Sequence, residues 1–219
     1  MLKATSIHKS YGKLQILKGV DIAVNEGEIV TIVGASGAGK SSLLNIIGTL
    51  DNADSGTVLI KDQDVSQLSK SQLSSFRNKQ IGFIFQFHHL LGEFTALENV
   101  CMPAFIGGQS KSEAEKRAKQ LLDMLGLSRR TDHKPSQLSG GEQQRVAVCR
   151  ALINSPALIL ADEPSGNLDS TNARELHQLF IDLRREFNQT FIIVTHNEEL
   201  SDLSDRKILM KDGMIVDSL

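Results

Sequence analysis

Residues 28–48, EIVTIVGASGAGKSSLLNIIG, constrain the fold of this 219-residue chain more than any other stretch. The unbroken, β-branched run Ile29–Val33 predicts a strand buried on both faces. The glycine-rich loop GASGAGKS at 34–41 follows directly, and the apolar residues of 43–47 predict a helix after it. A G-x-x-x-x-G-K-[ST] pattern between a strand and a helix is the setting in which this loop binds phosphate.

The chemistry of the loop indicates a nucleoside triphosphate as its ligand. Glycines let backbone N–H groups turn toward a polyphosphate, and the helix N-terminus adds the positive end of its dipole. Lys40 can reach the β- and γ-phosphates, and the Ser41 hydroxyl can ligate Mg²⁺. An ordinary glycine-rich turn is the alternative, which the strand and helix around the loop disfavour. We expect the triphosphate to contact Gly34, Ala35, Ser36, Gly37, Ala38, Gly39, Lys40, Ser41 and Ser42.

Length and composition limit the class of protein. The length suits one α/β domain with a helical insertion. With 24 basic and 26 acidic residues, the chain lacks the excess of positive charge that indicates extensive binding to nucleic acid or to an anionic membrane. Cys101 and Cys149 are isolated in apolar contexts, which favours buried thiols over a zinc site or a disulfide. No signal peptide and no membrane-spanning run is evident, so we expect a soluble, cytoplasmic protein that reaches a membrane only through a partner.

The apolar runs predict a mostly parallel sheet with two additions. Short runs before residue 29, and one at 57–60, predict antiparallel strands beside that sheet. Residues 62–80 are polar and predict a short helix with a loop. The apolar runs Ile81–Phe85, Ala157–Ala161 and Phe191–Val194 predict further strands of the main sheet. Asp212-Gly213, between two apolar runs, predicts a hairpin.

From about residue 87 to 150 the pattern becomes helical. Ser112 and Glu115 fit a capping box, and Gly126 fits the end of the helix that would follow. We therefore expect a single domain in which residues 1–86 and 151–219 form the α/β core with its antiparallel β subdomain. Residues 87–150 would form an inserted helical subdomain.

Polar residues follow the ends of the predicted parallel strands, where such sheets bind ligands. Asp162 fits a carboxylate that holds Mg²⁺ beside Ser41, and the alternative for this residue is a helix N-cap before Pro164. Glu163 is the residue expected to activate the attacking water. Gln86 fits an amide facing the Mg²⁺ or the water, and His196 fits a γ-phosphate contact. Taken alone, each of these last two would be unremarkable.

A second anion-binding helix N-terminus is predicted at QLSGGEQQR, residues 137–145. Ser139 and Glu142 form a capping box, and Gly140 and Gly141 leave backbone N–H groups uncovered. A helix over 141–153 would lead back into the strand at 157–161, which places its N-terminus away from Lys40. A head-to-tail dimer resolves this, because Ser139–Gly141 of one chain could then cover the triphosphate of the other.

With these motifs together, the chain resembles the nucleotide-binding subunits of ABC transporters over its full length. GASGAGKS is similar to the Walker A motif, LILAD to Walker B, LSGGEQQR to the signature and the 165–169 segment to the D-loop. The resemblance implies ATP as substrate, Glu163, His196 and Lys40 as catalytic residues, and Ser41, Gln86 and Asp162 at the Mg²⁺. It further implies that Tyr11 stacks on adenine, where composition alone would predict strand packing, and that two chains close around two ATP molecules. Ser42 and Ser165 stand where threonine is common in the family, and both keep a hydroxyl.

Residues 86–103, QFHHLLGEFTALENVCMP, are most similar to the ATPase subunits of lipoprotein-releasing systems. That resemblance implies a homodimer at the cytoplasmic face of the inner membrane, peripheral to two permease subunits that handle lipoprotein cargo. We expect the permease to dock near residues 86–106, with no nucleic acid involved. About half of the apolar side chains there would simply pack the subdomain. A macrolide-exporter-like or cell-division complex remains the alternative.

Other nucleotide-binding classes fit less well. The N-K-x-D motif of GTPases is absent, since Asn78-Lys79 is followed by Gln80-Ile81. DNA-repair ATPases with the same motifs carry long insertions, whereas about a hundred residues separate Lys40 from Ser139. Translation-linked ABC proteins normally carry two such domains in one chain.

Overall fold

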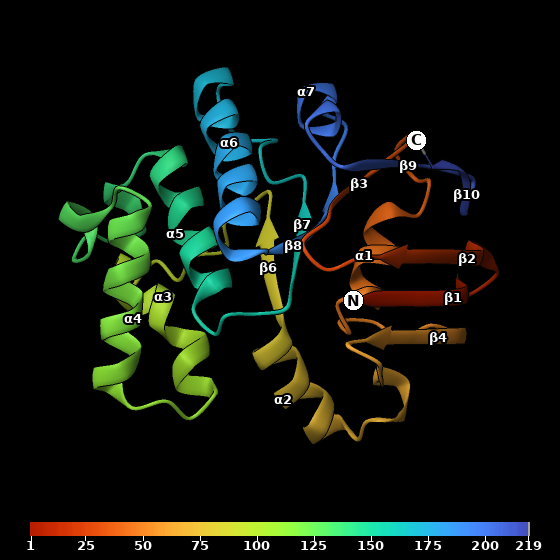
Figure 1. The fold of residues 1–219 in the computed structure, drawn as a ribbon, viewed down its shortest axis with the longest axis horizontal. Coiled ribbons are helices and arrows are strands. Elements are labelled where there is room, and N and C mark those ends of the chain that lie inside the picture. Colours follow the sequence, from red (N-terminus) through yellow and green to blue (C-terminus); the bar gives the residue numbers. More distant parts are fainter. Residues whose placement is uncertain (219) are drawn as a thin grey trace.

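A computed structural model describes residues 1–218 as two β-sheets flanked by helices (Figure 1). The smaller sheet is antiparallel, in the spatial order β2 (Leu14–Val24), β1 (Leu2–Tyr11), β4 (Ser55–Ile60), β5 (Gln63–Asp64). The larger sheet runs in the order β10 (Met214–Ser218), β9 (Arg206–Lys211), β3 (Ile29–Val33), β8 (Thr190–Val194), β7 (Leu158–Asp162), β6 (Ile81–Phe85). Its strands from β9 to β6 are parallel, and β10 adds an antiparallel edge.

The helices divide between the two sides of the larger sheet. The longer ones are α1 (Lys40–Ile47), α2 (Lys70–Gln80), α3 (Ala96–Ile106), α4 (Lys111–Met124), α5 (Gly140–Leu152) and α6 (Ser170–Phe187). Short turns of helix occur at α7 (Glu198–Asp202), η1 (Val65–Gln67), η2 (Ser128–Arg130) and η3 (Pro135–Gln137). In Figure 1, α3, α4 and α5 gather at one end of the molecule and the antiparallel sheet lies at the other.

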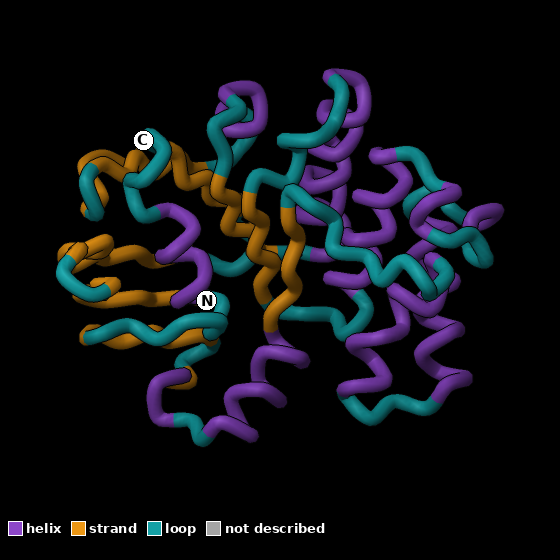
Figure 2. The backbone as a smooth tube through the Cα atoms, turned by 180° about the vertical axis from the view of Figure 1, so that it is seen from behind, coloured by secondary structure: helices purple, strands orange, loops and turns teal. Residues whose placement is uncertain are grey.

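Alternating side chains of the central strands pack into two separate hydrophobic cores, one on each face of the larger sheet. In β8, Phe191 and Ile193 belong to the core shared with α3, α4, α5 and α6, whereas Ile192 and Val194 face α1 and the antiparallel sheet. Both faces of the strand are therefore buried, which explains why the parallel strands appear in the sequence as unbroken apolar runs. The rear view in Figure 2 shows these strands running between the helical end and the antiparallel sheet.

Most of the predicted elements are confirmed. The strand at 29–33, the strand at 81–85, the antiparallel strands and the hairpin at 212–213 are all present. The capping box predicted at Ser112 and Glu115 is wrong, because α4 begins two residues earlier. Ser110 accepts from the backbone N–H of Glu113 at 3.3 Å, and Glu113 Oε2 accepts from the Ser110 N–H. Both pairs share the same spacing, so the sequence pattern alone does not separate them.

Candidate nucleotide-binding site

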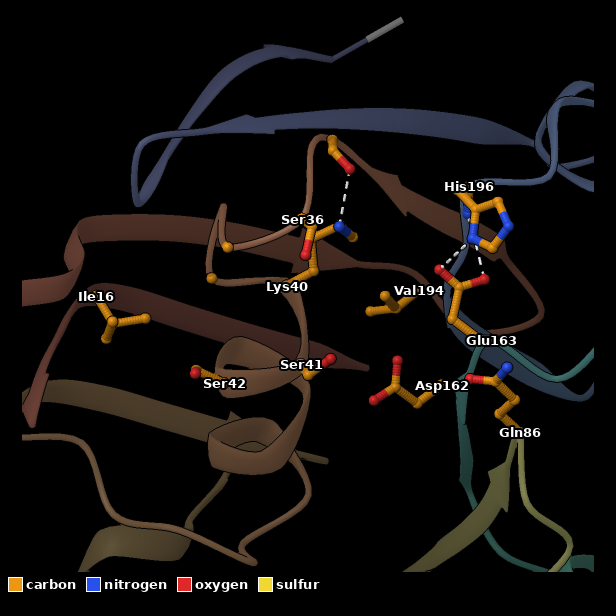
Figure 3. Close-up of a pocket in the computed structure, with 13 residues that line it drawn as sticks. Ile16, Ser36, Lys40, Ser41, Ser42, Gln86, Asp162, Glu163, Val194 and His196 are labelled. Carbon is orange, nitrogen blue, oxygen red and sulfur yellow. Dashed lines mark hydrogen bonds and ion pairs between the residues drawn. The ribbon is translucent and has the colours of Figure 1, made fainter. Parts of the chain in front are cut away.

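A cavity of about 510 Å³ lies at the carboxyl edge of the larger sheet (Figure 3). Strand register brings its residues together: Phe85 pairs with Asp162, and Asp162 pairs with Val194. The residues that follow these three strands therefore start at the same level. The loop after β3 closes the other side. Of the predicted residues, those lining the cavity are Gly34, Ser36, Gly37, Gly39, Lys40, Ser41, Ser42, Gln86, Asp162, Glu163 and His196.

The loop of residues 34–39 has a backbone that glycine makes possible. Gly34 has φ 150°, and a Cβ there would lie 2.1 Å from the Met210 carbonyl oxygen. Gly39, at φ 98°, precedes α1 without a side-chain cap, so the first N–H groups of that helix have no side-chain oxygen acceptor at their N-cap. Lys40 Nζ donates to the carbonyl oxygens of Gly34 at 2.8 Å and Ala35 at 3.0 Å. An anion at this helix N-terminus would meet donors and a positive charge.

Oxygen donors for a divalent cation meet beside this loop. Asp162 ends β7 between Ser41 and Gln86 (Figure 3). Burial raises the pKa of the Asp162 carboxyl, and a hydrogen bond with Ser41 opposes that shift. A hydroxyl, a carboxylate and an amide oxygen fit Mg²⁺, which takes few protein ligands and completes its shell with water and phosphate. Accordingly, no cluster of three His, Cys, Asp or Glu side chains suited to a metal occurs in residues 1–218. The alternative role of Asp162 as a helix cap is wrong, because the next helix, α6, is capped by Asp169.

Glu163 and His196 contact each other across the mouth of the cavity. His196 Nδ1 lies 2.8 Å from Glu163 Oε1, and the His196 backbone N–H donates to Oε2 at 3.3 Å. Glu163 has a left-handed backbone, φ 47°, and its N–H donates to the Val194 carbonyl oxygen at 2.9 Å. A non-glycine residue held in this conformation is strained, and such strain concentrates at functional sites.

Gln86 is engaged by a neighbour that the sequence analysis did not single out. Its Nε2 donates to Asn167 Oδ1 at 3.0 Å, and Asn167 Nδ2 donates to the Gln86 carbonyl oxygen at 3.1 Å. This reciprocal pair ties the end of β6 to the loop after Glu163. A polar residue in the segment 165–169 was the only sequence signal for it.

Tyr11 lies outside the cavity, which is lined at that side by Ile16. The Tyr11 hydroxyl donates to Asp51 Oδ2 at 2.6 Å, and Lys9 Nζ sits 5.0 Å from the ring centroid. Tyr11 is nevertheless 51% exposed, so this hydrogen bond does not bury it. The hydrogen bond to Asp51 raises the pKa of the Tyr11 hydroxyl.

The segment Ser139–Glu142 also lies away from the cavity, at the N-terminus of α5. The predicted capping box is present: Ser139 Oγ accepts from the Glu142 N–H at 3.2 Å, and Glu142 Oε2 accepts from the Ser139 N–H at 2.8 Å. The hydrogen bond from the Ser139 N–H lowers the pKa of the Glu142 carboxyl, and Arg130 Nε, which donates to Glu142 Oε1 at 2.8 Å, lowers it further. Gly140 and Gly141 thus form a second, separate N-terminus suited to an anion.

The apolar segment after β6 divides into buried and exposed side chains. Leu90 and Leu97 pack against the helical core. Phe87 is 66% exposed, and Leu91 and Phe94 are also exposed. Beside them a cavity of about 530 Å³ opens between β6, α2, α3 and α5, with His89 and Arg150 in its lining.

Comparison with known proteins decides the family. The model of the family described as ABC transporter matches residues 17–166.

The chain belongs to the ABC transporter family.

Relatives of this ABC ATPase cover nearly its whole length. It is 63% identical over 216 residues to a Cytophaga hutchinsonii protein named Lipoprotein-releasing system ATP-binding protein LolD, covering 99% of each chain. A Bacteroides fragilis protein of the same name is 60% identical, with 99% of this chain and 100% of the other covered.

Solved structures agree with the fold of this ABC ATPase. An ATP-binding cassette described as dimeric, in a post-hydrolysis state bound to ADP and Pi, superposes with a TM-score of 0.91 at 41% identity. The match covers 100% of this chain and 98% of that one. The predicted α/β P-loop fold is thereby confirmed. Within residues 1–218, no helix is both long and apolar enough to cross a bilayer.

Proposed function

We propose that this chain is the ATP-hydrolysing subunit of an ABC transporter that closes as a head-to-tail dimer around two ATP molecules. One observation carries the proposal: the phosphate loop shares a cavity with Asp162, Glu163 and His196, while the anion-binding N-terminus at Ser139 lies outside it. A single chain therefore carries two separate parts of a phosphate site, the phosphate loop and the helix N-terminus at Ser139, and they do not meet within that chain.

The polar residues of the cavity, together with Tyr11 outside it, have distinct roles in this proposal. The loop N–H groups and Lys40 bind the β- and γ-phosphates, and Lys40 exchanges its two carbonyl acceptors for phosphate oxygens. Ser41, Asp162 and Gln86 would hold Mg²⁺, which would neutralise phosphate charge. Glu163 orients the attacking water and accepts its proton, and His196 keeps the Glu163 carboxylate in place. Tyr11, which is largely exposed, would stack its ring on the adenine.

The dimer follows from the positions of the two halves. Ser139, Gly140, Gly141 and Glu142 of the partner would bring the second helix N-terminus onto the γ-phosphate. The closed dimer then depends on contacts of both chains with the γ-phosphate. Because hydrolysis removes the γ-phosphate, the dimer opens after the reaction.

Complementation between two inactive variants tests this arrangement. Ser139→Asp keeps an N-capping side chain, so α5 stays folded, but sets a negative charge against the triphosphate. Lys40→Ala disables the loop of the same chain. In a head-to-tail dimer, a mixed pair has one site with both defects and one site with neither. Mixing the variants should therefore restore part of the ATPase activity, and a mixture as inactive as its parts would contradict the proposal.

We further propose that the permease powered by this subunit releases lipoproteins from the bacterial inner membrane. The names of the relatives support this, as do the exposed apolar side chains Phe87, Leu91 and Phe94 within residues 86–106, where two permease subunits would dock. The chain would then be peripheral to the cytoplasmic face, with residues 1–86 and 151–219 as the core and 87–150 as the helical subdomain.

Co-purification separates this cargo from the alternative. The tagged chain should carry two related membrane subunits and bound lipoproteins out of gently solubilised membranes. A self-pairing exporter subunit or a division-site protein would favour the macrolide-exporter-like or cell-division alternative. Recovery of the chain alone, with full ATPase activity, would count against a transport role.

A further inference from the structure

One fully buried side chain connects three functional segments. Gln144, in α5, is 0% exposed. Its Nε2 donates to the Pro164 carbonyl oxygen at 2.7 Å, directly after Glu163 in the chain. Its Oε1 is hydrogen-bonded to Nδ1 of His88, in the segment that follows Gln86. A buried amide that meets both of its partners fixes their relative positions, because losing either one leaves a polar group unsatisfied.

The chemistry of the partners determines the direction of both hydrogen bonds. A proline carbonyl can only accept, so the NH₂ of Gln144 must face Pro164. The Gln144 oxygen then faces His88 and can only accept. His88 must therefore donate from Nδ1, which fixes which ring nitrogen carries the proton. The bridge works only with a donor at that one ring position.

The same helix holds the main chain of this segment. Arg150 Nη2 donates to the His88 carbonyl oxygen at 2.8 Å, and Nη1 donates to that of His89 at 2.7 Å. His89 has a left-handed backbone, φ 49°, which these bonds help to hold. Helix α5 begins at Gly140, within the signature motif. This one helix therefore connects the signature motif with the residues that follow Gln86 and with the loop after Glu163.

We propose that His88 and Gln144 are positioning residues for Glu163, which set the orientation of its carboxylate through the Pro164 carbonyl. The inference rests on the proposed function. Glu163 is held on one side by its N–H to Val194 and on the other by the Gly166 N–H, which donates to the Glu163 carbonyl oxygen at 3.0 Å. Pro164 lies inside the turn that the Glu163 carbonyl and the Gly166 N–H close, so the position of its own carbonyl sets the backbone conformation of that turn, directly next to Glu163. Phe87, 66% exposed beside His88, is where a bound permease would reach this bridge.

The test compares two substitutions of His88 in the complex with its membrane subunits, using ATP and Mg²⁺. His88→Ala removes the donor. His88→Asn retains one, because asparagine Nδ2 and histidine Nδ1 are both attached to Cγ. We expect His88→Ala to lower kcat about five- to tenfold, as for one lost hydrogen bond, with an unchanged KM for ATP. His88→Asn should restore most of kcat.

Two controls separate positioning from general stability. His8→Ala removes a histidine whose Nδ1 is 2.9 Å from the Ser6 carbonyl oxygen in the antiparallel sheet, remote from the cavity, and should leave kcat unchanged. Thermal unfolding of each variant shows whether the fold is retained. A raised KM in His88→Ala, or equal losses in the alanine and asparagine variants, would overturn the inference.

The outcomes also separate this inference from the proposed function. If the wild-type complex hydrolyses ATP and His88→Ala matches it, the positioning role is wrong and the ATPase stands. If the wild-type complex has no ATPase activity, the proposed function fails first, and with it the inference that rests on it.

Discussion

His196 Nδ1 lies 2.8 Å from Oε1 of Glu163, so a histidine whose side chain is 75% exposed holds a carboxylate that is only 20% exposed. The carboxylate is thus anchored from the solvent side, at the mouth of the cavity. The contact joins the ends of β7 and β8, which strand register already places side by side.

Glu163→Gln should trap the ATP-bound dimer. The amide is nearly isosteric, but it cannot accept a proton, so hydrolysis should fall by about 10²–10⁴-fold while ATP still binds. Size-exclusion chromatography with ATP and Mg²⁺ should show dimers that persist. Monomers that remain under these conditions would contradict the assignment of Glu163.

Lys40→Ala should abolish tight nucleotide binding. The substitution removes the only lysine side chain among the residues that line the cavity within the described part of the chain. Calorimetric titration with ATP measures the affinity. Lys116→Ala, at an exposed position of α4, is the matched control and should bind as the wild type does. Retained affinity in Lys40→Ala would mean that the phosphate loop is misassigned.

Gly34→Ala should destabilise the fold as well as the site. The new Cβ would lie 2.1 Å from the backbone oxygen of Met210, which forces β9 or the loop to move. We expect a loss of about 1–3 kcal/mol in the free energy of unfolding. Gly140→Ala, where the nearest atom is 3.9 Å away, should unfold at the same denaturant concentration as the wild type. Equal stability of the two variants would show that the loop relaxes freely.

The buried thiols predict a loss of stability at alkaline pH. Burial raises the pKa of Cys101 from 9.0 to about 11, and it also raises the pKa of Cys149. Above pH 9 the unfolded chain can ionise these thiols while the folded chain cannot. Their contribution to stability is thus complete below pH 9 and declines as the pH rises toward 11. Denaturant unfolding from pH 8 to 11 should show a shallower decline in Cys101→Ala than in the wild type.

Local patterns predicted the strands and the phosphate loop because both depend on neighbouring residues. The run Ile29–Val33 and the glycines after it specify a buried strand and a turn without reference to the rest of the chain. Helix α6 was not predicted, although Leu176, Phe180 and Leu183 mark its buried face at helical spacing. Periodicity applied to residues 170–187 would have found it.

Local sequence patterns could not predict contacts between segments that are distant in the sequence. The bridge from His88 through Gln144 to Pro164 joins three segments whose proximity depends on the completed fold. Likewise, His177 Nε2 lies 3.2 Å from Ser165 Oγ, while its Nδ1 has no hydrogen-bond partner within residues 1–218. Nothing in the local sequence distinguishes Gln144 or His177 from the other residues of their helices. Tyr11 was placed on the adenine by resemblance, and its bond to Asp51 came only from the structure.

The position of β3 in the larger sheet has a consequence for biosynthesis. Its two neighbours, β8 and β9, pair Ile29 with Phe191 and Val30 with Arg206, so both come from the far end of the chain. While a ribosome is still translating the segment between β3 and β8, the strand that precedes the phosphate loop has neither of its partner strands. Such long-range pairing is slow to form. The nascent chain therefore emerges with its loop sequence complete but without a working ATP site, and acquires that site only after β8 and β9 have been synthesised.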